Sequence, residues 1–202
     1  MIFEYTEDLP VDINLSGILA IDTETLGLKN DRDRLCVLQI SDGDGNAHLI
    51  RFEFGKYHAP NLKKILLDKN NTTLFHYARF DIAVIYKYLD VLVQNIYCTK
   101  IASKLARTYA ESHSLKELCR ELVGVQISKQ QQSSYWGAET LSKEQKEYAA
   151  SDVLYLHKIR DRLNAILVRE HRMELAEECF KFLPHRATLD LKGWSDTDIF
   201  AW

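Results

Sequence analysis

Two short apolar runs near the start of the chain predict strands of a sheet. Residues 17–23 and 35–40 are rich in Ile, Leu and Val, as is typical of strands covered on both faces. The turn-forming residues SDGDGN at 41–46 lead into AHLIRF, which predicts a hairpin into a third strand. These would be the first strands of the fold, and they would be antiparallel.

After this hairpin the pattern alternates between helix and strand. It predicts a short helix over 62–67, a strand over 72–77 and a helix over 80–89. Antiparallel strands followed by such alternation indicate an α/β fold with a mixed sheet and helices on both of its faces.

Capping residues mark the start of two later helices. In each, Ser is followed three residues later by Glu or Gln, beginning at Ser114 and at Ser142. The first of these helices should end at Gly124. The polar, aperiodic residues 125–140 predict a long loop, and loops of this length are more often functional or mobile than idle.

Composition limits the class of protein. At 202 residues and 46% hydrophobic content, one domain over 1–202 is expected. The net charge of −3 gives no overall attraction to nucleic acid, which would need a local basic patch. No apolar stretch approaches the ~20 residues of a membrane span, so we expect a soluble protein without a membrane partner.

The cysteines predict neither a disulfide framework nor a zinc site. Four cysteines lie far apart without a CxxC pair, and no leader segment precedes them: Cys36, Cys98, Cys119 and Cys179. Reduced thiols of this kind indicate a cytoplasmic location.

Two acids at the end of the first apolar run suggest a metal site. Asp22 and Glu24 are two apart, so on a strand both side chains leave one face, with Cα atoms about 6.6 Å apart. Two like charges beside a buried strand are unfavourable, but a divalent cation with oxygen ligands reverses the sign. A solvated strand end would explain the pair equally, so further carboxylates are needed.

A third acid lies within an apolar stripe. In the helix that starts at Ser142, Tyr148 and Asp152 share that stripe with Leu156 and Ile159. A carboxylate there requires a metal or a partner charge, such as a buried Arg. Tyr148, one turn earlier, would be a neutral phenol. A further acid, Asp81, begins a helix, where the helix dipole alone could explain it.

Taken together, these residues have the order and spacing of the DEDD superfamily of 3′-5′ exonucleases. The chain resembles the ribonuclease D branch, and Tyr four residues before the last Asp identifies the tyrosine type. The resemblance covers about residues 15–170. It rests on DTET (Asp22, Glu24), HYARFD (Asp81), YAASDVLYL (Tyr148, Asp152), LCVLQIS, SLKELC and SKQQQSSYW. It implies a ribonuclease H-like sheet with the acids at its rim.

The chain departs from that pattern in places. Tyr135 replaces Asp in a Ser-Asp-Trp string, Glu139-Thr140 replaces Arg-Pro, and Cys98 stands where relatives often carry Asp. We expect a single-domain member, with a helix and an aromatic tail at about 171–202 and without the helical C-terminal domains of longer members. The tail would dock on the domain or on a second subunit, and the oligomeric state is left open.

The resemblance implies a mechanism with two divalent cations, Mg²⁺ or Mn²⁺, about 3.5–4 Å apart. Asp22 would bridge both ions, while Glu24 and Asp152 would hold the one that activates water. Asp81 would reach the second ion directly or through water, and Tyr148 would orient the attacking water. Nucleoside 5′-monophosphates would leave from the 3′ end.

The expected substrate is a single-stranded nucleic acid with a free 3′ end, with RNA favoured by the resemblance. Seven residues are candidates for contacting it: Thr25, Leu26, Gly27, His76, Phe80, Lys129 and Trp136. Core roles remain open for His76 and Phe80, and Trp136 could instead anchor its loop. Lys100, Lys104 and Arg107 could form a basic rim or simply a solvated helix face.

Three other functions compete with this one. A phosphatase of the haloacid dehalogenase type needs Asp-x-Asp, but the second acid here is Glu24, and no adjacent Asp-Asp pair follows. A non-catalytic nucleic-acid-binding descendant would usually have lost one of the four acids. A DNA exonuclease in repair or proofreading shares every catalytic group and stays open.

Overall fold

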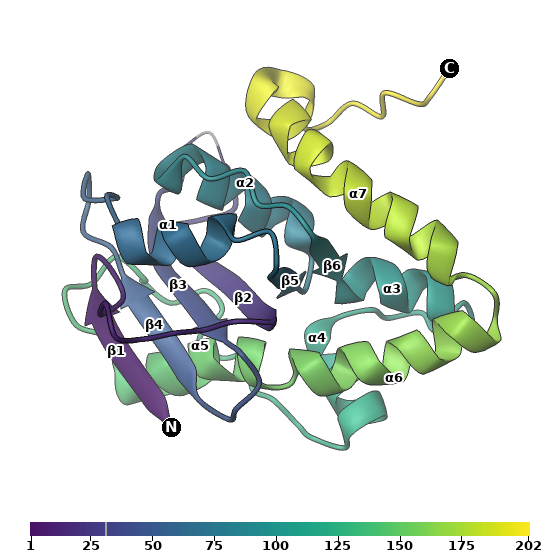
Figure 1. The fold of residues 1–202 in the computed structure, drawn as a ribbon, viewed down its shortest axis with the longest axis horizontal. Coiled ribbons are helices and arrows are strands. Elements are labelled where there is room, and N and C mark those ends of the chain that lie inside the picture. Colours follow the sequence, from purple (N-terminus) through teal and green to yellow (C-terminus); the bar gives the residue numbers. More distant parts are fainter. Residues whose placement is uncertain (31) are drawn as a thin grey trace.

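The computed structural model describes residues 1–30 and 32–202 and shows a six-stranded mixed sheet with helices on both faces (Figure 1). The strands are β1 (Ile2–Thr6), β2 (Ile18–Thr25), β3 (Leu35–Ser41), β4 (Ala47–Arg51), β5 (Thr72–Phe75) and β6 (Ile96–Cys98). The helices are α1 (Pro60–Leu67), α2 (Ala78–Leu89), α3 (Thr99–Ala106), α4 (Leu115–Leu118), α5 (Lys143–Leu154), α6 (Leu156–Arg169) and α7 (Met173–Leu189). The predicted α/β class is confirmed.

Strand β2 lies inside the sheet, whose order is β1-β4-β3-β2-β5-β6. The predicted hairpin is confirmed, because β2, β3 and β4 pair in antiparallel fashion. Strands β5 and β6 run parallel to β2 on its other side. The sequence analysis missed β1, which pairs parallel to β4, and β6. Strand β1 lies at the edge with no buried residue, and β6 has only three residues, so neither forms an apolar run.

The helices divide between the two faces of the sheet. Helix α2 packs against β2, β3, β5 and β6, and α5 packs against β1 to β4 from the other side (Figure 1). Helix α6 packs mainly on α3, and α7 on α2 and β6. The predicted continuous helix after Ser142 is wrong, because it breaks at Tyr155 (φ −103°, ψ −9°). The break lets the buried side chains of α6 meet α3 while α5 stays on the sheet.

The capping predictions hold to different degrees. Ser142 and Gln145 form the complete reciprocal box. Ser114 accepts from the Glu117 amide at 3.3 Å, but the Glu117 carboxylate pairs with Arg120 instead of closing the box. A π-helical turn over Cys119–Val123 follows α4 and ends at Gly124, whose φ of 75° suits glycine.

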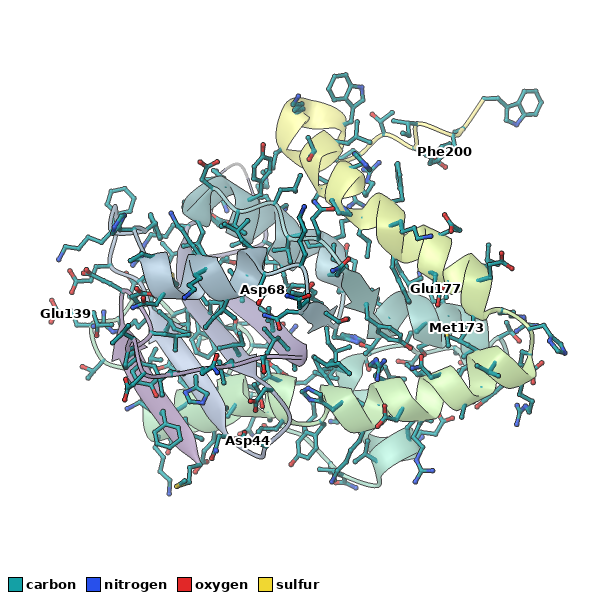
Figure 2. All side chains as sticks on the ribbon, viewed as in Figure 1. Asp44, Asp68, Glu139, Met173, Glu177 and Phe200 are labelled. Carbon is teal, nitrogen blue, oxygen red and sulfur yellow. The ribbon has the colours of Figure 1, made fainter. Side chains whose placement is uncertain are left out.

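The C-terminal segment extends from α7 away from the sheet (Figure 1). Arg186 donates to the carbonyl oxygens of Trp194, Ser195 and Thr197. Farther along, the ring of Phe200, labelled in Figure 2, lies 5.6 Å from that of Phe182. The tail therefore has contacts within its own chain.

Two further findings concern membrane spans and thiols. Among the helices in the part of the chain that the structure describes, none is long and apolar enough to cross a membrane. All four cysteines carry free thiols.

Candidate active site

Three of the predicted acids converge at one end of β2. Asp22 and Glu24 lie on this strand, and Asp152 approaches from α5. One carboxylate oxygen from each lies within 4.8 Å of the other two. Asp22 also accepts a hydrogen bond of 2.7 Å from Gln39 Nε2, directly opposite on β3. Three hard oxygen ligands at this spacing fit a divalent cation.

The fourth acid, Asp81, is tied to the same strand. It lies in the first turn of α2, and its Oδ1 accepts from the Thr23 amide at 3.0 Å and from the Thr23 hydroxyl at 2.7 Å. Thr23 stands between the other two acids of β2. The side chain of Asp81 is therefore held beside the three-carboxylate cluster, and the helix dipole is not its only role.

Burial makes this cluster electrostatically unfavourable without a cation. Burial raises the pKa of Asp22 to about 7. The pKa values of Glu24, Asp81 and Asp152 are also raised well above the usual range, first by burial and then by the charges of the neighbouring acids. A bound cation would offset both causes.

Tyr148 faces the same cluster. Burial, and next the charge of Asp152, raises the pKa of its phenol, so the side chain is neutral. Its hydroxyl is hydrogen-bonded to Asp152, one helical turn away. A neutral phenol in this place can donate to or accept from a water molecule.

A cavity of about 720 Å³ lies over these groups. The four acids and Tyr148 line it, together with six of the seven predicted substrate contacts: Thr25, Leu26, Gly27, His76, Phe80 and Lys129. Its wall also includes residues that the sequence analysis missed, among them Tyr77, Lys116 and Gln132. Tyr77 has a left-handed backbone (φ 69°) and begins α2, a feature that the sequence does not reveal.

The turn after β2 presents Leu26 at the mouth of this cavity. The Thr25 hydroxyl donates to the carbonyl of Gly27, and Leu26 between them is 44% exposed. A Cβ atom on Gly27 would overlap the carboxylate of Asp33. A larger residue at position 27 would therefore have to displace the Asp33 carboxylate, which accepts from the Lys29 amide.

Trp136 does not line the cavity, unlike the other six predicted substrate contacts. Its side chain is 1% exposed, and its ring packs against that of Tyr148, with centroids 6.0 Å apart and planes at 42°. The alternative of a Trp that anchors its loop therefore holds. The indole fixes the long loop against the helix that carries Tyr148 and Asp152.

The predicted basic rim is only partly present. Arg107 is fully buried; it pairs with Glu121 and donates to Ser103 Oγ at 2.9 Å, so it offers no charge to a ligand. The ammonium of Lys100 lines the cavity and lies 4.1 Å from the centroid of the Tyr77 ring. Lys104 lines a separate hollow against α7. The local positive charge at the cavity comes from Lys100, Lys116 and Lys129.

Comparison with known proteins agrees with this site. A family model described as "3'-5' exonuclease" matches residues 6–168. DNA polymerase I of Aquifex aeolicus is 33% identical over 75% of this chain and 25% of its own length. Ribonuclease D of Acidiphilium cryptum is 30% identical over 79% of this chain and 41% of its own. The chain thus spans less than half the length of these two relatives.

A solved structure matches over nearly the whole chain. NrnC of Brucella melitensis, bound to pGG, is 55% identical, with a TM-score of 0.96 over 99% of this chain and 98% of that one. The same protein has also been solved with bound Mg²⁺. The predicted family and the ribonuclease H-like sheet are thereby confirmed. The chain belongs to the 3′-5′ exonuclease family.

Proposed function

We propose that this protein removes nucleoside 5′-monophosphates from the 3′ end of single-stranded RNA with the help of two divalent cations. The observation that carries the proposal is the convergence of Asp22, Glu24 and Asp152 within 4.8 Å, with Asp81 held beside them. Asp22 is half-buried, and Glu24, Asp81 and Asp152 are buried. Carboxylates that repel one another in such a place need cations, and Mg²⁺ or Mn²⁺ suits their oxygens.

Each acid has a proposed role. Asp22 would contact both cations, Glu24 and Asp152 would complete one site, and Asp81 would serve the other. When bound, the cations lower the pKa of water and stabilise the leaving 3′ oxygen. Tyr148 would orient that water, because its neutral hydroxyl is already hydrogen-bonded to Asp152.

The rest of the cavity suits a short single strand. Leu26 and Phe80 offer apolar surfaces to bases, and Lys100, Lys116 and Lys129 offer charge to phosphates beyond the scissile one. The relative NrnC is bound to pGG, so we propose short 5′-phosphorylated oligonucleotides as substrates. The free thiols fit the cytoplasm, where such fragments would be met.

The test compares 5′-labelled RNA and DNA dimers and heptamers with Mg²⁺ or Mn²⁺. We expect stepwise 3′ shortening by the wild type, none in excess EDTA, and none by Asp22→Asn or Asp152→Asn. The matched control is Asp161→Asn, which makes the same change at an exposed position on α6. Full activity of either site variant, or full activity in EDTA, would contradict the mechanism.

DNA hydrolysis is the second candidate, because DNA polymerase I is among the relatives. Both substrates would need the same acids, so the site variants do not separate the two functions. The ratio of kcat/KM on matched RNA and DNA substrates separates the two functions. A higher kcat/KM on DNA than on RNA would favour DNA hydrolysis as the function.

A further inference from the structure

His76 lies at the end of the strand next to the acids. In the parallel pairing of β2 with β5, Ala20 stands opposite Leu74. Two residues farther along each strand direction are Asp22, inside β2, and His76, directly after β5, so their backbones lie side by side in the sheet. Neighbouring strands are about 4.8 Å apart. The imidazole also lines the cavity and is therefore within reach of a nucleotide held by the acids.

A chain of hydrogen bonds fixes which ring nitrogen of His76 carries the proton. Its Nδ1 lies 2.9 Å from the Thr99 hydroxyl, and that hydroxyl lies 3.1 Å from the Phe75 carbonyl oxygen. A carbonyl oxygen can only accept, so the single proton of Thr99 goes to Phe75. Thr99 must then accept from His76, which places the imidazole proton on Nδ1. The lone pair remains on Nε2.

The imidazole is also neutral. Burial, and next the charges of Lys100, Lys129 and His113, lower the pKa of His76 to about 3. At any pH near neutrality Nε2 is therefore a hydrogen-bond acceptor and never a donor. Nε2 is therefore an uncharged hydrogen-bond acceptor, whereas the charged side chains that line the same cavity are lysines and carboxylates.

The chemistry of a nucleic acid limits which of its groups can donate a hydrogen bond to Nε2 of His76. Phosphate oxygens only accept, so Nε2 cannot bind them. Donors on a nucleic acid are its sugar hydroxyls and the amino and ring N–H groups of its bases, and of these the sugar hydroxyls lie closer to the phosphate held by the acids. Only the 2′-hydroxyl distinguishes RNA from DNA.

We propose that Nε2 of His76 accepts a hydrogen bond from a substrate 2′-hydroxyl and that this contact makes the site prefer RNA. The inference rests on the proposed function, since it concerns the sugar of the strand being cut. Thr99 is a positioning residue, because its hydroxyl holds His76 in the accepting tautomer without touching the substrate. A deoxyribose would leave Nε2 unpaired in a buried place, which is unfavourable.

The test measures kcat/KM on RNA dimers and on the same dimers with one 2′-hydroxyl replaced by hydrogen, at each sugar in turn. For the wild type, we expect one position at which the ribose form is cut about tenfold faster. His76→Phe keeps a planar ring without nitrogen. In this variant the ratio of kcat/KM on the ribose form to that on the deoxyribose form should fall towards one, mostly because kcat/KM on the ribose form decreases. Thr99→Val should lower the ratio partly, and Thr99→Ser should keep it.

Several outcomes would overturn the inference. The first is a ratio of ribose to deoxyribose kcat/KM that is near one at every sugar in the wild type. The second is a ratio that is unchanged in both His76→Phe and Thr99→Val. The third is a kcat/KM that depends on a 3′-hydroxyl or on a base N–H group instead of a 2′-hydroxyl. The last is seen by comparing 3′-deoxy ends, and by comparing adenine with purine and uracil with N3-methyluracil, since the bases of each pair differ by the loss of the donor group. If His76→Phe fails to give a cooperative thermal melt, Thr99→Val carries the test. A wild type that cuts neither RNA nor DNA would instead refute the proposed function.

Discussion

The metal-free protein should be destabilised by its own active site in a way that depends on pH. The pKa of Asp22 is raised from its ordinary value of 3.8 to about 7. Between these two values the folded protein holds the proton more tightly than the unfolded chain does. The contribution of Asp22 to the free energy of unfolding therefore falls as pH rises through this window, and this contribution is level above it.

The size of the effect follows from the width of the window. One pKa unit corresponds to about 1.4 kcal/mol, so the two units from pH 5 to pH 7 amount to about 3 kcal/mol. Asp22→Asn removes this titration. Relative to the wild type, the variant should gain about 3 kcal/mol in unfolding free energy between pH 5 and pH 8. Relief of Glu24 and Asp152 from the Asp22 charge acts in the same direction.

The assay is urea denaturation of both proteins in EDTA at pH 5 and pH 8, followed by circular dichroism. Burial lowers the pKa of His48 and His76, which destabilises both proteins at low pH and cancels in the difference. Added Mg²⁺ should stabilise the wild type and reduce or reverse the difference at pH 8. The reasoning is refuted if the difference does not grow with pH in EDTA, or if Asp161→Asn shows the same growth.

Three further substitutions test other parts of the site. Trp136→Ala should cost about 3–5 kcal/mol in unfolding free energy and lower kcat, because it empties the space behind Tyr148; a stability within 0.5 kcal/mol of the wild type would contradict this packing. Arg107→Ala should cost about 3 kcal/mol by urea denaturation, since it removes a fully buried side chain and its hydrogen bonds to Ser103 and Glu121; an unchanged midpoint would show that this buried side chain contributes nothing. Leu26→Ala should leave stability within about 0.5 kcal/mol but lower kcat/KM about tenfold, and an unaltered rate would remove Leu26 from the substrate contacts.

The acids on β2 could be predicted from the sequence because local rules place them. An apolar strand that ends in Asp22 and Glu24 must put both on one face, whatever the rest of the chain does. Asp152 was recognisable because a carboxylate on an apolar stripe is costly. Asp81 was ambiguous alone, since its contact is with Thr23, 58 residues earlier, and no local pattern reports such a contact.

Burial of large side chains outside regular stripes could not be predicted. Trp136 lies in an aperiodic loop, and only the approach of Tyr148 shows that it faces inward. Arg107 carries the same charge as Lys100, but its side chain is buried and pairs with Glu121 from another segment. Residue type and spacing contain no information on such partners.

The interruption of the helix at Tyr155 separates two parts of the protein that can vary independently. One residue inserted into α5 ahead of Asp152 would turn that carboxylate by about 100° around the helix axis and away from its companions. The same insertion within α6 would leave Asp152 in place, because α6 follows the break, and would instead shift side chains that face α3, α7 and the π-helical turn. An insertion or deletion in the turns of α5 before Asp152 should therefore abolish catalysis, whereas one after residue 155 should act through stability alone.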